Sequence, residues 1–212
     1  MKKKIGILGT GSFAREVYCH LDEIFLGKLD AIFLELDYEE LKFNKLFIKN
    51  NWVPVINKFE HSSGYKQFVV GIGDPVLKKK LVGKAILMGF TPNETVIHPR
   101  ALIQDVAHIG KGGIICPGVI ITTNVTIEDY VIINLNATVG HDVIIKNYCT
   151  INPGVNLSGN VYLGDSCVLG TGSIVREGIR IESETVVGAQ AAVVKNIVEK
   201  GVYGGVPSQK LK

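Results

Sequence analysis

The sequence has few cysteines, few aromatic residues and no long apolar run. Four cysteines in 212 residues are too few for a disulfide scaffold, and no CxxC pair suggests zinc. No apolar run approaches the ~18 residues of a membrane span. The short apolar run after the first lysines also lacks the length and cleavage site of a signal peptide. We therefore expect a cytoplasmic protein with no membrane span.

The sequence also lacks an excess of charge of either sign. Its 23 basic and 20 acidic side chains give a formal net charge of +3. That balance argues against a protein that binds nucleic acid or a membrane surface through its charge, so any partner must be recognised locally. Apolar residues make up 46% of the chain, which excludes disorder for most of it.

The residues that are present divide the chain into two parts. Twelve aromatic residues precede residue 95 and four follow it, whereas nine glycines precede that point and fifteen follow. We predict one domain over 1–94 and a second over 95–212.

The second part contains a repeat of six residues. Every sixth position over 97–193 is Ile, Leu or Val: Ile97, Ile103, Ile109, Ile115, Ile121, Ile127, Ile133, Val139, Ile145, Ile151, Leu157, Leu163, Leu169, Val175, Ile181, Val187 and Val193. Two residues before most of these positions lies a small or β-branched residue. A helix has period 3.6 and a strand period 2, so a period of six indicates short strands joined by regular corners. Stacked turns of such strands bury an aliphatic column.

This pattern resembles the hexapeptide-repeat proteins, whose left-handed parallel β-helix completes one coil in eighteen residues. The narrow prism explains the scarcity of aromatic rings. With this spacing Cys149 and Cys167 stack inside the prism, and we interpret them as small core residues. No two histidines of the repeat lie eighteen apart or at a short ligand spacing, so we expect no metal site.

One histidine of the repeat is a candidate for catalysis. His141 lies two residues past the inward Val139, so it occupies an outward corner. An outward histidine is usually surface decoration, but Gly140 leaves space beside it and Asp142 supplies a neighbouring carboxylate. An imidazole with a pKa near 6.5 can accept a proton at neutral pH.

The segment Asn134–Asn160 and the closing segment Lys200–Pro207 resemble the sialic acid O-acetyltransferase family, which includes the bacillosamine-pathway N-acetyltransferases of nucleotide-linked 4-amino sugars. The resemblance implies that His141 is the general base, that Asp142 orients it, and that acetyl-coenzyme A lies between neighbouring subunits of a homotrimer. By the same resemblance Gly159 supplies the oxyanion donor. The acetyl-coenzyme A contacts map onto Thr150, Thr171 and Ala189 as well as Gly159, and Asn134 is a candidate sugar contact.

The first part contains a GxGxxA pattern. Residues 5–17 predict a buried strand, a glycine turn and a helix, and Glu35 closes a second strand that begins at Ala31. This is the outline of a βαβ unit that binds a dinucleotide or phosphate. A third strand over 68–74 leads into a helix over 75–88. About ninety residues are too few for a dehydrogenase.

The family resemblance makes this part an α/β Rossmann-like domain that binds the nucleotide end of the acceptor. The contacts it implies are Gly9, Gly11, Ser12, Phe13 and Glu35. The run Lys78-Lys79-Lys80 is interpreted as the solvated face of the following helix.

The sequence thus predicts an acetyl-coenzyme A-dependent N-acetyltransferase that acts on a nucleotide-linked amino sugar for surface glycan synthesis. O-acetylation of sialic acid or another sugar hydroxyl is the alternative within enzymes. A non-catalytic solenoid that serves as a binding or assembly module is the alternative from another class, because the repeat alone supports it equally well.

Overall fold

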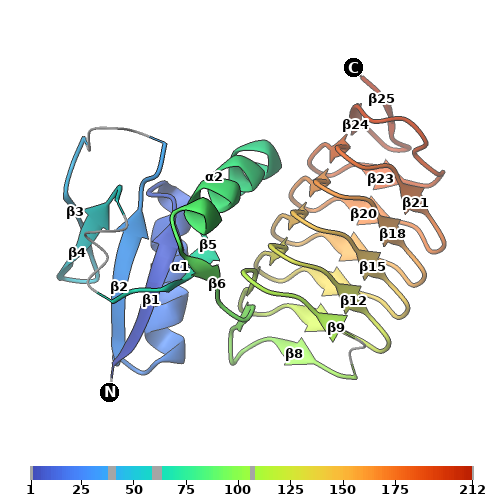
Figure 1. The fold of residues 1–212 in the computed structure, drawn as a ribbon. Helices are drawn as coiled ribbons and strands as arrows, with labels where there is room; N and C mark the ends of the chain where they lie inside the picture. The colour runs from blue at the N-terminus through green and yellow to red at the C-terminus, as the bar shows by residue number, and fades with distance from the viewer. Residues whose placement is uncertain (1, 38–41, 59–63, 106–107, 212) are drawn as a thin grey trace.

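The computed structural model describes residues 2–37, 42–58, 64–105 and 108–211. A sheet flanked by two helices comes first along the chain, and a three-sided solenoid of short parallel strands follows (Figure 1). The predicted β-solenoid is confirmed. Among the described residues, no helix combines the length and the apolarity needed to cross a bilayer.

The first sheet has the strand order β3-β4-β2-β1-β5-β6. Strand β1 lies between β2 and β5 and is parallel to both, as a βαβ unit requires. The hairpin of β3 and β4 is antiparallel, and no pattern in the sequence indicated it. The bounds are β1 Lys3–Leu8, α1 Ser12–Ile24, β2 Leu29–Leu34, β3 Lys45–Ile48, β4 Asn51–Ile56, β5 Gln67–Val70, α2 Pro75–Leu87 and β6 Thr91–Pro92.

Each helix covers one face of this sheet. Successive side chains of a strand point to opposite faces. Ile5 and Ile7 of β1 accordingly belong to the same buried cluster as Val17 of α1, whereas Leu8 belongs to a second cluster with Leu81 of α2. With one helix on each face, the loops after β1, β2 and β5 meet at one end of these strands.

The solenoid has three faces, which we number by their strands. Face 1 contains β7 Val96–Ile97, β10 Ile114–Ile115, β13 Ile132–Ile133, β16 Thr150–Ile151, β19 Val168–Leu169, β22 Val186–Val187, β24 Val202–Gly204 and β25 Gln209–Lys210. Face 2 contains β8 Leu102–Ile103, β11 Ile120–Ile121, β14 Thr138–Val139, β17 Asn156–Leu157, β20 Ile174–Val175 and β23 Ala192–Val193. Face 3 contains β9 His108–Ile109, β12 Thr126–Ile127, β15 Ile144–Ile145, β18 Tyr162–Leu163 and β21 Arg180–Ile181.

Neighbouring strands of a face pair residue with residue at a spacing of eighteen. Ile115 pairs with Ile133, and Ile133 pairs with Ile151. The repeat positions from Ile115 onward are all buried, as predicted. Ile97 is instead 39% exposed, because it lies in the first coil, and its strand β7 is the last of its sheet.

The corners contain residues in the left-handed conformation, one above another. At the corner between faces 2 and 3, Asn124, Asp142 and Asn160 have φ values of 55°, 59° and 57°. Asn and Asp tolerate this conformation better than most side chains do. The eighteen-residue coil therefore stacks short polar side chains in a column at this corner.

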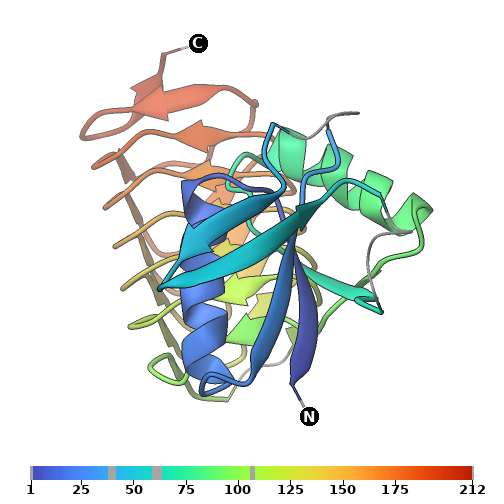
Figure 2. The ribbon, with the colours of Figure 1, turned by 90° about the vertical axis from the view of Figure 1, so that its left-hand side faces the viewer.

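The sheet domain lies against face 1, and Figure 2 shows it in front of the solenoid. A buried lysine of α2 joins the two parts. The Nζ of Lys78 donates to the carbonyl oxygens of Tyr130, Tyr148 and Cys149 at 3.1–3.2 Å and to the hydroxyl of Thr150 at 2.9 Å. Lys78 is fully buried. The interpretation of Lys78-Lys79-Lys80 as a solvated face is therefore wrong at Lys78, because that side of α2 faces the solenoid.

A second contact joins α1 to the solenoid at the corner between faces 1 and 2. The Nε2 of the buried His98 lies 3.1 Å from the Glu23 carboxylate. This contact lowers the pKa of Glu23. The sheet domain is thus held on face 1 from both of its helices.

Replacing Lys78 with methionine tests the first of these contacts. Burial lowers the pKa of Lys78 from 10.5 to about 7. Between these values the unfolded chain binds one more proton than the folded chain, so this lysine makes stability rise with pH in that window. In Lys78→Met the carbonyls of Tyr130 and Tyr148 lose their donor, so we expect a loss of about 2 kcal/mol near pH 7.

The measurement is urea unfolding of the parent, Lys78→Met and the exposed control Lys79→Met. From pH 7 to pH 10 the parent should gain unfolding free energy relative to Lys78→Met and keep a constant difference from Lys79→Met. A difference between the parent and Lys78→Met that does not change with pH would contradict the assignment.

Candidate active site

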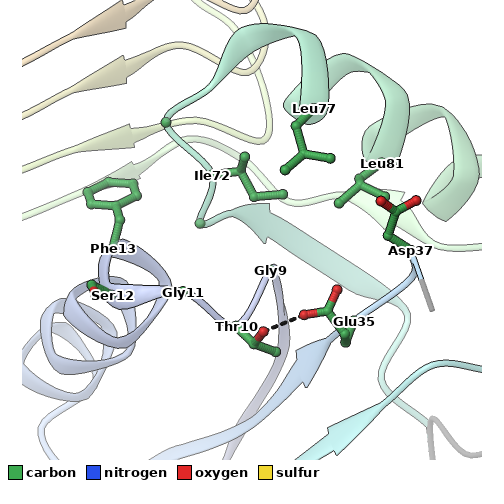
Figure 3. A pocket seen from close by; sticks show the side chains of 12 residues that line it. Gly9, Thr10, Gly11, Ser12, Phe13, Glu35, Asp37, Ile72, Leu77 and Leu81 are labelled. Atoms are coloured by element: carbon green, nitrogen blue, oxygen red, sulfur yellow. Dashed lines mark hydrogen bonds between the residues drawn. The ribbon is translucent and has the colours of Figure 1, made fainter. Parts of the chain in front are cut away.

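A pocket of about 330 Å³ lies where β1, β2 and β5 end (Figure 3). Ligands of open α/β sheets bind at this edge, between a central strand and its two neighbours. Four of the five predicted nucleotide contacts are the loop residues Gly9, Gly11, Ser12 and Phe13, and the fifth is Glu35; all of them line the pocket. The structure therefore brings this predicted group together.

One end of the pocket is the start of α1. Gly11 caps the helix, and no side chain of the described residues bonds to its first amides, which leaves them available to an anion. A Cβ built on Gly11 would meet no other atom within 4 Å, so it would project into open space. By contrast, Gly9 has a φ of 99° and lies close against Ile72, so it must be glycine for backbone reasons.

The other end of the pocket has apolar and acidic walls. Ile72, Leu77 and Leu81 supply the apolar surface, and Glu35 and Asp37 supply the carboxylates. The hydroxyl of Thr10 donates to Glu35. The arrangement suits a molecule with a charged group at the helix end and a flat ring at the apolar end.

A second candidate site lies at the corner of the solenoid between faces 2 and 3. The Nδ1 of the exposed His141 is 2.8 Å from Oδ2 of Asp142, and Asn124 Nδ2 donates to Oδ1 of the same carboxylate at 2.6 Å. The hydrogen bond from Asn124, followed by that from His141, lowers the pKa of Asp142. With Asp142 ionised, Nδ1–H donates to it and Nε2 keeps its lone pair for a proton.

The imidazole of His141 stacks on the glycine one coil above. A Cβ on Gly159 would overlap the ring and lie 2.5 Å from its Nε2. A Cβ on Gly140 would lie 2.8 Å from the Gly159 nitrogen. Among the hydrogen bonds of the described residues, none has this amide as donor. The two glycines therefore let the imidazole lie against a buried amide that has no acceptor among the described residues.

The remaining predicted contacts lie elsewhere on the solenoid. Thr171 and Ala189 are exposed and stack at the corner between faces 1 and 2, where Asn134 also lies, although Asn134 is buried. Thr150 is buried on face 1, and its hydroxyl donates to the Gly73 carbonyl at 2.7 Å and accepts from Lys78. These four residues do not join His141 within one chain.

Several residues of these sites were not predicted, among them Asn124 and Asp37. Asn124 lies eighteen positions before Asp142, so the repeat spacing contained the signal for it. Asp37 gave no such signal, because its place in the pocket depends on how α2 packs. Among the described residues, no cluster of three or more His, Cys, Asp or Glu side chains could hold a metal ion.

The solenoid with a sheet domain docked on it resembles the hexapeptide-repeat sugar acyltransferases in fold. Comparison with known proteins then gives particular relatives. GDP-perosamine N-acetyltransferase of Escherichia coli O157:H7 is 29% identical over 140 residues, which cover 65% of this chain and 62% of that protein. The match thus spans less than two thirds of the relative. No protein-family model matches the chain.

Solved structures match over almost the whole chain. PerB of Caulobacter crescentus, in complex with CoA and GDP-perosamine, has a TM-score of 0.83 and 28% identity and covers 99% of this chain and 98% of its own. The acetyltransferase domain of PglB from Neisseria gonorrhoeae, in complex with acetyl coenzyme A, has a TM-score of 0.82 and 25% identity and covers 100% of both chains. The predicted resemblance to sugar acyltransferases is confirmed, and these relatives fit the prediction of an acyltransferase that uses acetyl-coenzyme A.

Replacing Asn124 with glycine tests the carboxylate of the second site. Glycine keeps the left-handed backbone and removes the amide donor. We expect the pKa of Asp142 to rise toward its ordinary value, as measured by NMR titration of carboxyl ¹³C shifts. Asn160→Gly is the matched control, because Asn160 occupies the same column one coil away. An unchanged pKa in Asn124→Gly, or an equal rise in both variants, would contradict the assignment.

Proposed function

We propose that this protein is an acetyl-coenzyme A-dependent N-acetyltransferase that acts on the amine of a nucleotide-linked amino sugar. The observation that carries the proposal is the imidazole of His141, which an ionised Asp142 holds against Gly159, whose amide donates no hydrogen bond among the described residues. A pocket suited to a nucleotide lies in the same chain. The relative solved with coenzyme A and GDP-perosamine supports both the acetyl donor and the nucleotide-linked amino-sugar acceptor of the proposed reaction.

The reaction needs one base and one oxyanion donor. The amine nitrogen of the sugar attacks the thioester carbonyl of acetyl-coenzyme A, and Nε2 of His141 accepts the amine proton. The carbonyl oxygen becomes negative in the tetrahedral intermediate and accepts a hydrogen bond from the Gly159 N–H. The carbon–sulfur bond then breaks, and the imidazolium returns its proton to the leaving thiolate. Asp142 keeps the ring in the required tautomer.

The proposal includes a homotrimer with active sites between chains. His141 lies at the corner between faces 2 and 3, which is opposite face 1, where the sheet domain sits. Thr171 and Ala189 lie at the other edge of face 2. A ligand that contacts His141 as well as Thr171 and Ala189 is therefore best held between two chains that meet at face 2, with one corner supplied by each chain. On this face Leu102 and Ile174 are 56% and 50% exposed, which suits a buried interface.

Further parts of the proposal follow the family resemblance. We infer a left-handed coil, a Rossmann-like sheet domain over 1–94 and a catalytic domain over 95–212. Thr150, Thr171, Ala189 and Asn134 remain proposed contacts of acetyl-coenzyme A and the sugar. A cytoplasmic location fits the four cysteines, which are all free thiols. A role in surface glycan synthesis fits an amino-sugar product.

The test is acetyl transfer by His141→Ala. We expect release of coenzyme A thiol with an amino-sugar nucleotide to fall by roughly 10²–10⁴-fold, because the general base is lost. Binding of coenzyme A should be retained. His108→Ala is the matched control, since His108 is an exposed histidine on face 3 of the same solenoid.

The product distinguishes the alternatives. An N-acetyl product resists hydroxylamine, whereas an O-acetyl ester is cleaved by it. A cleaved product would replace the proposal with O-acetylation. Parental activity in His141→Ala would show that the assigned base is wrong, and no transfer by the parent to any amino-sugar nucleotide would favour a non-catalytic module.

A further inference from the structure

The apolar end of the nucleotide pocket contains a carboxylate that the proposed reaction does not use. Asp37 lies at the pocket edge with Leu81 (Figure 3). It lies two residues past Glu35, so the pocket offers in succession the helix start, Glu35 and Asp37. A nucleotide with its diphosphate at Gly11 and its ribose at Glu35 would therefore place its base between Asp37 and the apolar wall.

Two lysines of α2 hold this carboxylate in a defined orientation. Lys80 Nζ lies 2.7 Å and Lys84 Nζ lies 3.2 Å from the same oxygen, Oδ1 of Asp37. Lys84 also donates to the Leu36 carbonyl. Among the described residues, none donates a hydrogen bond to Oδ2. One oxygen is thus anchored by cations, and the other has no donor in the part of the chain that the structure describes.

The lysines also determine the charge of the group. The hydrogen bond from Lys80, followed by that from Lys84, lowers the pKa of Asp37. The carboxylate is therefore ionised at neutral pH and can only accept hydrogen bonds. A base that meets it must present donors, and a base that presents an acceptor there leaves both groups unsatisfied.

We infer that Asp37 is a specificity-determining residue that selects guanine as the base of the acceptor nucleotide. This inference rests on the proposed function. Guanine presents two adjacent donors, N1–H and the 2-amino group, on its Watson–Crick edge. Adenine and cytosine each pair one donor with an acceptor, and uracil flanks its single N–H with two carbonyls. Guanine is therefore the base whose edge matches an acceptor-only group. The flat ring packs on Leu77 and Leu81.

The anchoring of Oδ1 determines what Asp37→Asn does. The lysines are donors, so the amide oxygen of the variant stays at the Oδ1 position and the NH₂ group replaces Oδ2. The pocket then presents a donor where it presented an acceptor. Xanthine has N1–H, like guanine, but a carbonyl in place of the 2-amino group. The variant should therefore prefer xanthosine diphosphate to GDP.

The experiment is calorimetric titration of the full-length protein with GDP, inosine diphosphate, xanthosine diphosphate and UDP. The parent should bind GDP about tenfold more tightly than inosine diphosphate, which lacks the 2-amino group, because one charge-assisted hydrogen bond is lost. UDP should bind more weakly than GDP. The affinity of Asp37→Asn for GDP should be about tenfold or more below that of the parent, and xanthosine diphosphate should bind to this variant more tightly than GDP. This gain of binding also shows that the variant is folded.

Glu35→Gln is the matched control. It should weaken all four ligands by a similar factor, because the ribose is common to them, and leave the ratio of GDP to inosine diphosphate unchanged. A parent that binds UDP as tightly as GDP, or an Asp37→Asn variant that keeps the parental preference, would overturn the inference and leave the proposed function intact. A parent that binds no nucleoside diphosphate would overturn both.

Discussion

The function proposed for this protein depends on one geometric constraint, which is the register between successive coils of the solenoid. Each coil pairs with the next at a spacing of eighteen residues, so a corner side chain stacks on its counterpart in the next coil. This register brings Asn124 within 2.6 Å of Asp142 and places His141 against Gly159. A shift of one residue would turn the buried aliphatic positions outward and separate all four.

The second constraint is the docking of the sheet domain on face 1. Lys78 donates to three carbonyls and a hydroxyl of the solenoid, and Glu23 contacts His98 at the next corner. Because buried polar groups need partners, these contacts favour one placement of the domain over others. That placement puts the pocket at the ends of β1, β2 and β5 on the side of the prism away from His141. A single chain therefore holds both parts of the proposed active site but does not join them.

The sequence predicted the features that have a local or periodic cause. The solenoid core follows from a repeat of six, and the pocket group of Gly11 and Glu35 follows from a strand, a glycine turn and a helix. The features it missed depend on packing between distant elements. In the sequence Lys78 cannot be distinguished from its neighbouring lysines, because its burial depends on the packing of α2 against the solenoid. Asp37 is anchored by lysines more than forty residues away, and no spacing rule connects them.

The most direct test of a shared active site is complementation between two inactive chains. His141→Ala removes the proposed base and leaves the pocket, and Gly11→Val places its Cβ in open space at the start of α1, where no other atom lies within 4 Å. Each variant alone should lack acetyl transfer. Co-expressed in equal amounts, they should regain about a quarter of the parental activity, because random assembly joins an intact pocket to an intact neighbouring base in that share of sites. Mixed oligomers with no activity would show that pocket and base act within one chain, and would contradict this account.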